Sequence, residues 1–150
     1  MSHTSRRAKP SDGAGIATVY LRSTAKLGFL RRCHDAEDMW RHFIQLHQEQ
    51  EIWVTVEAGR IAAFLALTPG WIEHLYVHPA HQNKGIGQGL VSIAKQSSAD
   101  GLNLWTFQQN AGAQKFYEQN GFRPDLVTDG RRNEERLPDI RYTWTNTNDT

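Results

Sequence analysis

The spacing of apolar residues along the first third of the chain predicts helices. Apolar positions three and four residues apart mark a helix whose buried stripe includes Ala17 and Tyr20, and a second helix over 35–47. Ser11 or Asp12 is the residue expected to cap the first of them.

After residue 50 the pattern changes to alternation and to short apolar runs, which are typical of strands. Turns at Gly59 and Gly70 are expected to join the first three of these strands into an antiparallel meander. The predicted strands span 5–9, 51–57, 60–67, 71–77, 102–107, 122–128 and 140–145, and two further helices span 82–98 and 111–119. Seven strands and four helices in this mixed order predict an α/β (α+β) fold around one central sheet.

Length and composition are those of an ordinary soluble domain. With 150 residues, 39% of them hydrophobic and 22% charged, we expect a single domain over 1–150 with disordered ends at about 1–4 and 146–150. The longest apolar run, 61–67, is far shorter than a membrane span. The polar N-terminus has no signal-peptide core. A cytoplasmic protein without a membrane partner is therefore expected.

Charge balance and the metal-ligating residues argue against two further classes of protein. The 17 Lys and Arg nearly balance the 16 Asp and Glu, whereas nucleic-acid binders carry a clustered basic excess. The single cysteine, Cys33, can form neither an internal disulfide nor a thiolate metal site. The 7 histidines lack the HExxH spacing. Neither a nucleic-acid partner nor a metal is expected.

A glycine-rich segment follows the third strand of the meander. Gly85, Gly87 and Gly89 lie at the start of a predicted helix, where glycine costs ~1 kcal/mol relative to alanine. Glycines at a helix N-terminus let a pyrophosphate approach unpaired N–H groups, with Lys84 and Gln82 as further donors. The segment is neither GxxxxGK(S/T) nor GxGxxG. The alternative is that these glycines only allow the helix to pack closely on a strand.

Two motifs carry a resemblance to a known family. Gln82-x-x-Gly85-x-Gly87, directly after a strand, resembles the acetyl-CoA signature Gln/Arg-x-x-Gly-x-Gly/Ala of the GNAT (general N-acetyltransferase) superfamily. The segment from Asn110 to Phe122 resembles that family's block N-x-x-A-x-x-F/Y-Y-x-x-x-G-F. The resemblance implies a mixed, mostly antiparallel sheet of about seven strands with four helices, splayed at the acetyl-CoA site.

The resemblance also implies which residues bind acetyl-CoA. Backbone groups of Leu75 and Val77 would pair with the pantetheine arm as an added strand does. Asn110 would bind the arm or orient groups near the thioester. The pyrophosphate would rest on the N–H groups of Gln82, Asn83, Lys84, Gly85, Ile86, Gly87 and Gln88.

Acetyl transfer to an amine requires a deprotonated amine, a donor for the developing oxyanion and a proton donor for the leaving thiolate. The resemblance makes Tyr117 the general acid and a further cofactor contact. Because adjacent helical residues point about 100° apart, Phe116 is expected in the core while Tyr117 faces the cleft. The alternative is that Tyr117 is an aromatic core residue.

Glu73 is the candidate base. Strict alternation places it on the face of Leu75 and Val77, with His74 packed on the opposite face. Glu73 could then accept the amine proton directly or through water if partial burial raises its pKa. A carboxylate paired with an arginine or solvated at the sheet edge is the equally weighted alternative.

Two further features are open between a structural and a functional role. The loop over 129–139 is either a solvated hairpin or a rim of the acceptor site on which Glu134, Glu135 or Asp139 attracts a cationic amine. Trp53, Trp71 and Trp105 line an acceptor pocket or pack the core, and core packing is the expectation.

Taken together, the sequence predicts an acetyl-CoA-dependent N-acetyltransferase. It would transfer acetyl directly to a primary amine of a small-molecule or peptide acceptor, with Tyr117 and Glu73 as catalytic residues. The alternative is a non-catalytic acyl-CoA-binding sensor or interaction module. A homodimer is left open, since dimers are common in the family and the last strand offers an exposed edge.

Overall fold

The computed structural model describes residues 3–25, 41, 45, 49–98, 100–133 and 136–146. The elements are β1 (His3–Arg7), α1 (Gly13–Thr24), β2 (Glu51–Glu57), β3 (Arg60–Thr68), β4 (Trp71–Val77), α3 (Ile86–Ser97), β5 (Leu102–Phe107), α4 (Ala111–Gln119), β6 (Arg123–Thr128) and β7 (Asp139–Trp144). Two 3-10 turns, Pro10–Asp12 and Pro79–His81, precede α1 and α3.

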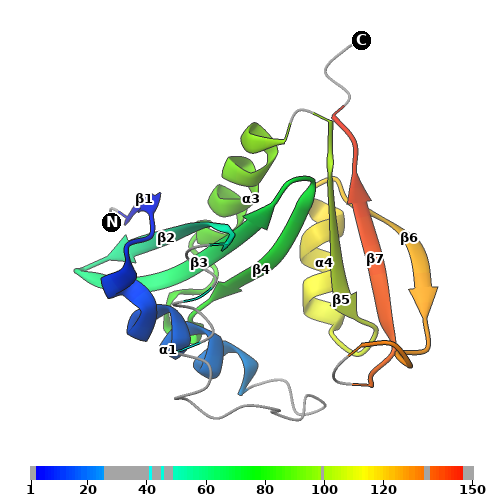
Figure 1. Cartoon of the computed structure of the whole chain (residues 1–150), viewed down its shortest axis with the longest axis horizontal. Helices are drawn as coiled ribbons and strands as arrows, with labels where there is room; N and C mark the ends of the chain where they lie inside the picture. The colour runs from blue at the N-terminus through cyan, green and yellow to red at the C-terminus, as the bar shows by residue number, and fades with distance from the viewer. Residues whose placement is uncertain are drawn as a thin grey trace.

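All seven strands form one sheet in the order β1-β2-β3-β4-β5-β7-β6 (Figure 1). β1 to β4 pair antiparallel with their neighbours, and β5, β7 and β6 form a second antiparallel group. The two groups meet where β4 and β5 run parallel, with Trp71 opposite Asn103 as their single register pair. The predicted mixed, mostly antiparallel sheet is confirmed, as is its splay between the predicted strands 71–77 and 102–107.

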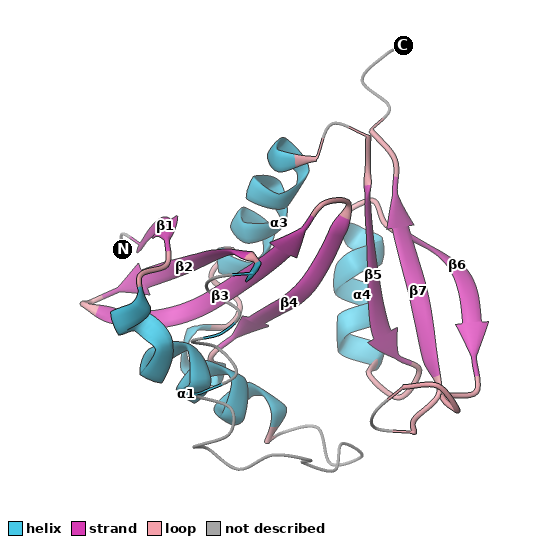
Figure 2. Cartoon of the chain, in the orientation of Figure 1, coloured by secondary structure: helices cyan, strands magenta, loops and turns pink. Residues whose placement is uncertain are grey.

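Helices cover both faces of the sheet (Figure 2). Ile16 and Val19 of α1 pack with Phe64 and Ala66 in one core cluster. The other cluster joins buried residues of α3 and α4 to alternate residues of β3, such as Leu65. β3 is therefore buried on both faces, which explains its continuous apolar run.

The described residues contain three α-helices, whereas four were expected. The helix predicted over 35–47 lies outside the described residues, apart from positions 41 and 45. Within the described part of the chain, no helix is long and apolar enough to cross a membrane.

Several boundaries differ from the sequence-based expectation. The helix expected from Gln82 begins at Ile86, because a 3-10 turn and a loop with Gly85 in the left-handed region come first. The last strand, β7, lies between β5 and β6, so the exposed edges of the sheet are β1 and β6. At the N-terminus, His3 and Thr4 lie in β1, opposite Glu57 and Val56.

A β-bulge interrupts β4 at Glu73. Ala66 pairs with His74 and Leu67 pairs with Ile72, which leaves Glu73 as the extra residue. The alternation predicted for β4 is therefore wrong at this point. Ile72, rather than Glu73, shares the core cluster of Leu75 and Val77.

Asp12 fastens the entry of α1 to β1. It occupies the N-cap position, but its side chain does not cap α1. Its carboxylate instead accepts hydrogen bonds from the Arg6 guanidinium at 2.8 and 3.1 Å and from the Lys9 backbone N–H at 2.7 Å. Arg6 first, and then Lys9, hold the pKa of Asp12 below its ordinary value despite partial burial.

We expect Asp12→Asn to lower the free energy of unfolding at pH 7 by about 1–2 kcal/mol. Because the folded-state pKa of Asp12 is lowered, its stabilisation is present above its unfolded pKa of ~4 and is lost as pH falls through the folded value. Urea unfolding at pH 7 and pH 3 measures this. Asp125→Asn, which breaks the bidentate contact to Arg141 on the exposed surface, is the control and should cost less than about 0.5 kcal/mol. Equal losses in the two variants would contradict the anchoring role.

Candidate active site

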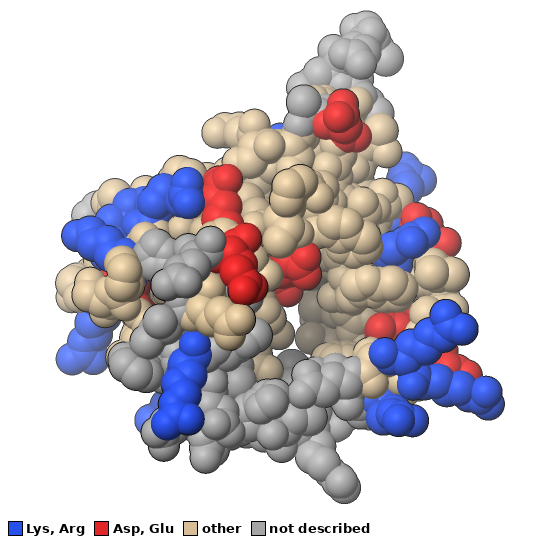
Figure 3. Space-filling view, viewed as in Figure 1, with Lys and Arg blue, Asp and Glu red and all other residues tan. Residues whose placement is uncertain are grey.

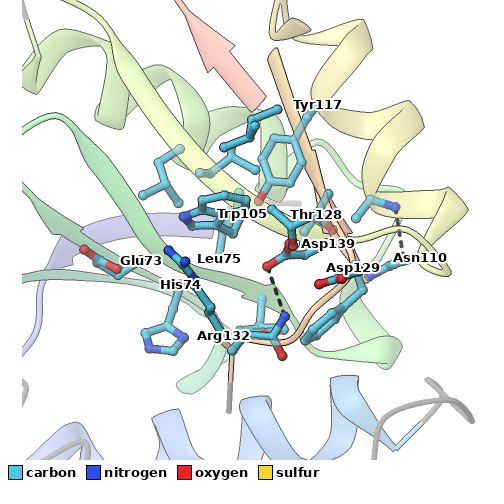
Figure 4. A pocket seen from close by; sticks show the side chains of 18 of the residues that line it. Glu73, His74, Leu75, Trp105, Asn110, Tyr117, Thr128, Asp129, Arg132 and Asp139 are labelled. Carbon is cyan, nitrogen blue, oxygen red and sulfur yellow. Dashed lines mark hydrogen bonds between the residues drawn. The ribbon is translucent and has the colours of Figure 1, made fainter. Parts of the chain in front are cut away.

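A cavity opens where β4 and β5 separate. The strands are held together at one end, where the Asn103 backbone N–H and side-chain amide donate to the Gly70 carbonyl at 2.8 and 3.2 Å. Beyond this point lies a cavity of about 850 Å³, lined by residues of β4, β5, α4 and the loop between β6 and β7 (Figure 4). Its walls bring Glu73, Leu75, Asn110 and Tyr117 around one space.

The edge of β4 that faces this gap is polar. His78 N–H donates to the Ala62 carbonyl at 2.8 Å, so the even-numbered residues at this end of β4 pair with β3. Leu75 and Val77 consequently present their own N–H and C=O groups to the gap. The Gln82 side-chain amide already donates to the Val77 carbonyl at 3.2 Å. This geometry fits an extended ligand added beside β4.

The loop before α3 offers unpaired backbone donors. The N–H groups of residues 82–88 find no acceptor within the described part of the chain. The hydrogen bonds of α3 begin with Gly89, whose N–H donates to the Gly85 carbonyl at 3.0 Å. Asn83 and Gly85 have φ values of +65° and +81°, which bend the loop into the helix start. A concave row of N–H groups at a helix N-terminus favours an anion.

Three glycines lie at the start of α3, and the structure explains each of them differently. A Cβ on Gly87 would lie 3.1 Å from the Phe116 ring, so this glycine permits close packing of α3 on α4. Gly85 has open space around it and is required by its positive φ. Gly89 has neither constraint. Close packing therefore explains one of the three positions.

Lys84 is tied back to β2 rather than free at the rim. Its amino group donates to Glu57 Oε1 at 2.8 Å, and His81 Nδ1 lies 3.4 Å from Glu57 Oε2. Lys84 first, and His81 second, keep the pKa of Glu57 below its ordinary value. The carboxylate therefore anchors both ends of the 81–84 turn.

Tyr117 is both buried and at the cavity. Its side chain is 8% exposed and its ring contacts Phe116, Phe122 and Tyr142. The hydroxyl has no hydrogen-bond partner among the described residues, and the residue lines the cavity. Burial raises the pKa of Tyr117 well above its ordinary value, so the hydroxyl is protonated at neutral pH.

Asn110 has a structural role in addition to its place in the cavity wall. It is the N-cap of α4, and its Oδ1 accepts from the Ala113 backbone N–H at 3.1 Å. It therefore directly precedes the helix that carries Tyr117. Phe116 is partly buried against Gly87.

Glu73 is exposed at the cavity wall. Thr68 Oγ1 donates to its carboxylate at 2.7 Å. The partial burial on which its predicted role as a base depended is therefore absent. His74 packs on the α1 side, with its ring centroid 6.4 Å from that of Tyr20, as predicted.

The loop between β6 and β7 is ordered around Asp139. This buried carboxylate contacts Thr128 Oγ1 and accepts from Asn133 Nδ2 at 3.1 Å. Asn133 also closes the loop on the backbone of Leu137 through its side chain. Asp139 thus has a structural role in the loop, and it also lines the cavity. Glu134 and Glu135 lie outside the described residues.

Some cavity residues were missed in the sequence. Trp105 is 44% exposed and lines the cavity, so the expectation of core packing is wrong for it. The alternation of residues along β5 could have predicted this exposure, since its neighbours Leu104 and Thr106 are both buried. Arg131 and Arg132 line the cavity as well, and a run of charges alone did not single them out. The described residues contain no cluster of side chains suited to a metal ion.

Comparison with known proteins agrees with the fold and the motifs. Residues 48–124 match the acetyltransferase (GNAT) domain family. The uncharacterized N-acetyltransferase YhfO of Bacillus subtilis is 32% identical over 137 residues, covering 80% of this chain and 89% of that protein. The peptidyl-lysine N-acetyltransferase YjaB of Salmonella typhimurium is 30% identical over 122 residues, covering 79% and 81%.

Solved structures show the same fold. Apo YjaB from Escherichia coli superimposes with a TM-score of 0.79 at 20% identity, covering 96% of this chain and 98% of that one. The putative acetyltransferase yncA of Salmonella typhimurium, solved with acetyl-CoA, gives a TM-score of 0.71 at 20% identity, covering 95% and 92%. The chain belongs to the GNAT family and is an acetyltransferase.

Proposed function

We propose that this protein transfers the acetyl group of acetyl-CoA directly to a primary amine. The observation that carries the proposal is the cavity between β4 and β5. It gathers the open backbone edge of β4, the Tyr117 hydroxyl and the Glu73 carboxylate around one space. Acetyl-CoA supplies the acetyl group as an activated thioester.

The residues of the chain fit this cosubstrate at two places. Leu75 and Val77 offer backbone groups to the amides of a pantetheine arm, as in strand addition. Residues 82–88 offer unpaired N–H groups to a pyrophosphate. Gln82 would leave the Val77 carbonyl when the arm binds.

Tyr117 is proposed as the proton donor to the leaving thiolate. A donor must be protonated at the working pH, and burial ensures this for a phenol. Asn110 keeps its Nδ2 group for the cleft, since its Oδ1 caps α4. The partial burial that favoured Glu73 as a direct base is absent, so Glu73 is proposed to accept the amine proton only through water, from its exposed place at the cavity wall.

A non-catalytic acyl-CoA sensor is the alternative. A protein that only binds acyl-CoA does not need a protonated hydroxyl in the cleft. Tyr117 provides one that has no hydrogen-bond partner among the described residues, which favours an enzyme. Peptidyl-lysine is one acceptor class to test, since the relative YjaB is named for it. The single-domain organisation, cytoplasmic location and homodimer stay predictions.

Acetyl-CoA is expected to raise the thermal midpoint in a saturable way, whereas NAD does not. At about 100 times the Kd, a ligand adds ~2.7 kcal/mol, or several degrees at roughly 2–4 °C per kcal/mol. Gly85→Ala should weaken this shift, because a side chain at φ +81° costs about 1–2 kcal/mol and distorts the loop. Gly89→Ala is the matched control. It should keep the shift and add up to ~1 kcal/mol of stability. No shift at millimolar acetyl-CoA would contradict the cofactor assignment.

Tyr117→Phe is expected to lower kcat by roughly 10²- to 10³-fold with little change in acetyl-CoA affinity. Because the pKa of Tyr117 is raised, the wild-type pH–rate profile should show no falling limb from this group below about pH 10. Thiol release with an amine panel measures both. Tyr142→Phe removes another buried phenol, which donates to Glu118 at 2.7 Å, and should cost stability but not turnover. A Tyr117→Phe enzyme with the wild-type kcat would exclude Tyr117 as the general acid.

Glu73→Gln is expected to shift or abolish the rising limb of the pH–rate profile, because an amide cannot accept the proton. Glu51→Gln, on β2 and bonded to the Trp53 indole, is the control and should keep the wild-type profile. If the profile of Glu73→Gln is unchanged, the amine loses its proton to water or before it binds.

A further inference from the structure

The two aspartates at the loop between β6 and β7 already have partners within the loop region. Asp139 is held by Thr128 and Asn133. Asp129 Oδ2 lies 3.1 Å from Arg131 Nε. Asp129 is therefore paired with a cation, whereas Asp139 keeps its charge but is held in the loop by two neutral donors.

Four charged residues in or next to this loop line the cavity, namely Asp129, Arg131, Arg132 and Asp139. Arg132 is the one whose side chain has no partner among the described residues. No carboxylate among the described residues lies within ion-pair distance of its guanidinium, and it lines the cavity. Figure 4 shows its side chain directed from the loop toward the β4 wall, where Glu73 and His74 lie. Figure 3 shows Lys and Arg side chains, with Asp and Glu side chains among them, over this end of the molecule beside a hollow in the surface.

The cavity consequently combines the exposed Glu73 carboxylate on β4, the Arg132 guanidinium on the loop and an apolar stretch of its lining. Glu73 is exposed on β4. Trp105 and Leu126, which are 44% and 42% exposed, supply the apolar part. Such a distribution fits a ligand that carries both charges on a small apolar body.

We propose that the acceptor is a small primary amine that bears a carboxylate, with that carboxylate bound by Arg132. A guanidinium presents its N–H groups as a fork that matches a carboxylate. The ammonium end would approach Glu73, and the apolar part would lie along Trp105. This inference rests on the proposed function and specifies its acceptor.

The acceptor's carboxylate takes no part in the bond changes. The amine nitrogen forms a bond to the acetyl carbon while the carbon–sulfur bond breaks. The amine proton leaves by way of Glu73 and water, and the thiolate takes the Tyr117 proton. The products are the N-acetylated acid and the free thiol.

Matched acceptors test the proposal. Thiol release is measured with free amino acids, with phenylalanine as the apolar reference, and with their uncharged amides such as phenylalaninamide. We expect kcat/KM for the preferred acid to exceed that for its amide by roughly tenfold or more, equivalent to about 1.4 kcal/mol. The ratio should fall at high salt, because the contact is partly exposed.

Charge variants assign the preference to one side chain. Arg132→Gln should bring the acid-to-amide ratio to within about twofold of one, Arg132→Glu should invert it, and Arg132→Lys should restore part of it. Arg123→Gln is the matched control, because this exposed arginine of β6 does not line the cavity. It should keep the preference, and the acetyl-CoA thermal shift should be the same in all four variants.

The contrary outcomes are distinct. Amides turned over as fast as acids, lysine peptides preferred over every free acid, or a preference that survives in Arg132→Gln would each overturn the inference while leaving acetyl transfer intact. If no amine releases thiol, the proposed function fails first. Calorimetric binding of the same acids and amides to the CoA-loaded protein then decides the inference by itself.

Discussion

The site depends on two neighbouring strands that do not pair along their length. β4 and β5 share the contact of Gly70 with Asn103 and then diverge. Buried N–H and C=O groups must find partners, so full pairing would have used the groups of Leu75 and Val77. Because the strands separate, the N–H and C=O groups of Leu75 and Val77 remain available to a ligand. They lie in the middle of the sheet, away from its edge strands β1 and β6.

The core on the α3 and α4 side keeps the strands apart. Gly87 lets α3 approach Phe116, which fixes the loop of free N–H groups against the helix that carries Tyr117. Tyr117 in turn packs on Phe122 and Tyr142. The donors for an anion and the proton donor are therefore linked through packed side chains of α3 and α4.

The sequence was sufficient for the parts of the molecule that follow a period or a motif. The strand and helix order, the splay and the places of Gly85 and Tyr117 were predictable on these grounds. The bulge at Glu73 was not, because the extra residue of a bulge leaves no mark in an alternating pattern. The same holds for Asp139 and Arg132. Which charges of a loop are consumed internally depends on hydrogen bonds that only the folded loop makes, such as those of Asn133.

The way in which the loop between β6 and β7 is held has an evolutionary consequence. Asn133 and Asp139 fix its backbone from inside, and Gln108 after β5 donates to the carbonyls of Thr128, Pro138 and Asp139 at its two ends. Arg132, at the exposed tip, takes part in none of these contacts. A single codon change at residue 132 would then alter which acceptor is chosen at little cost to folding. A lineage with this loop is able to explore new acceptors while the acetyl-donor half of the machinery stays as it is.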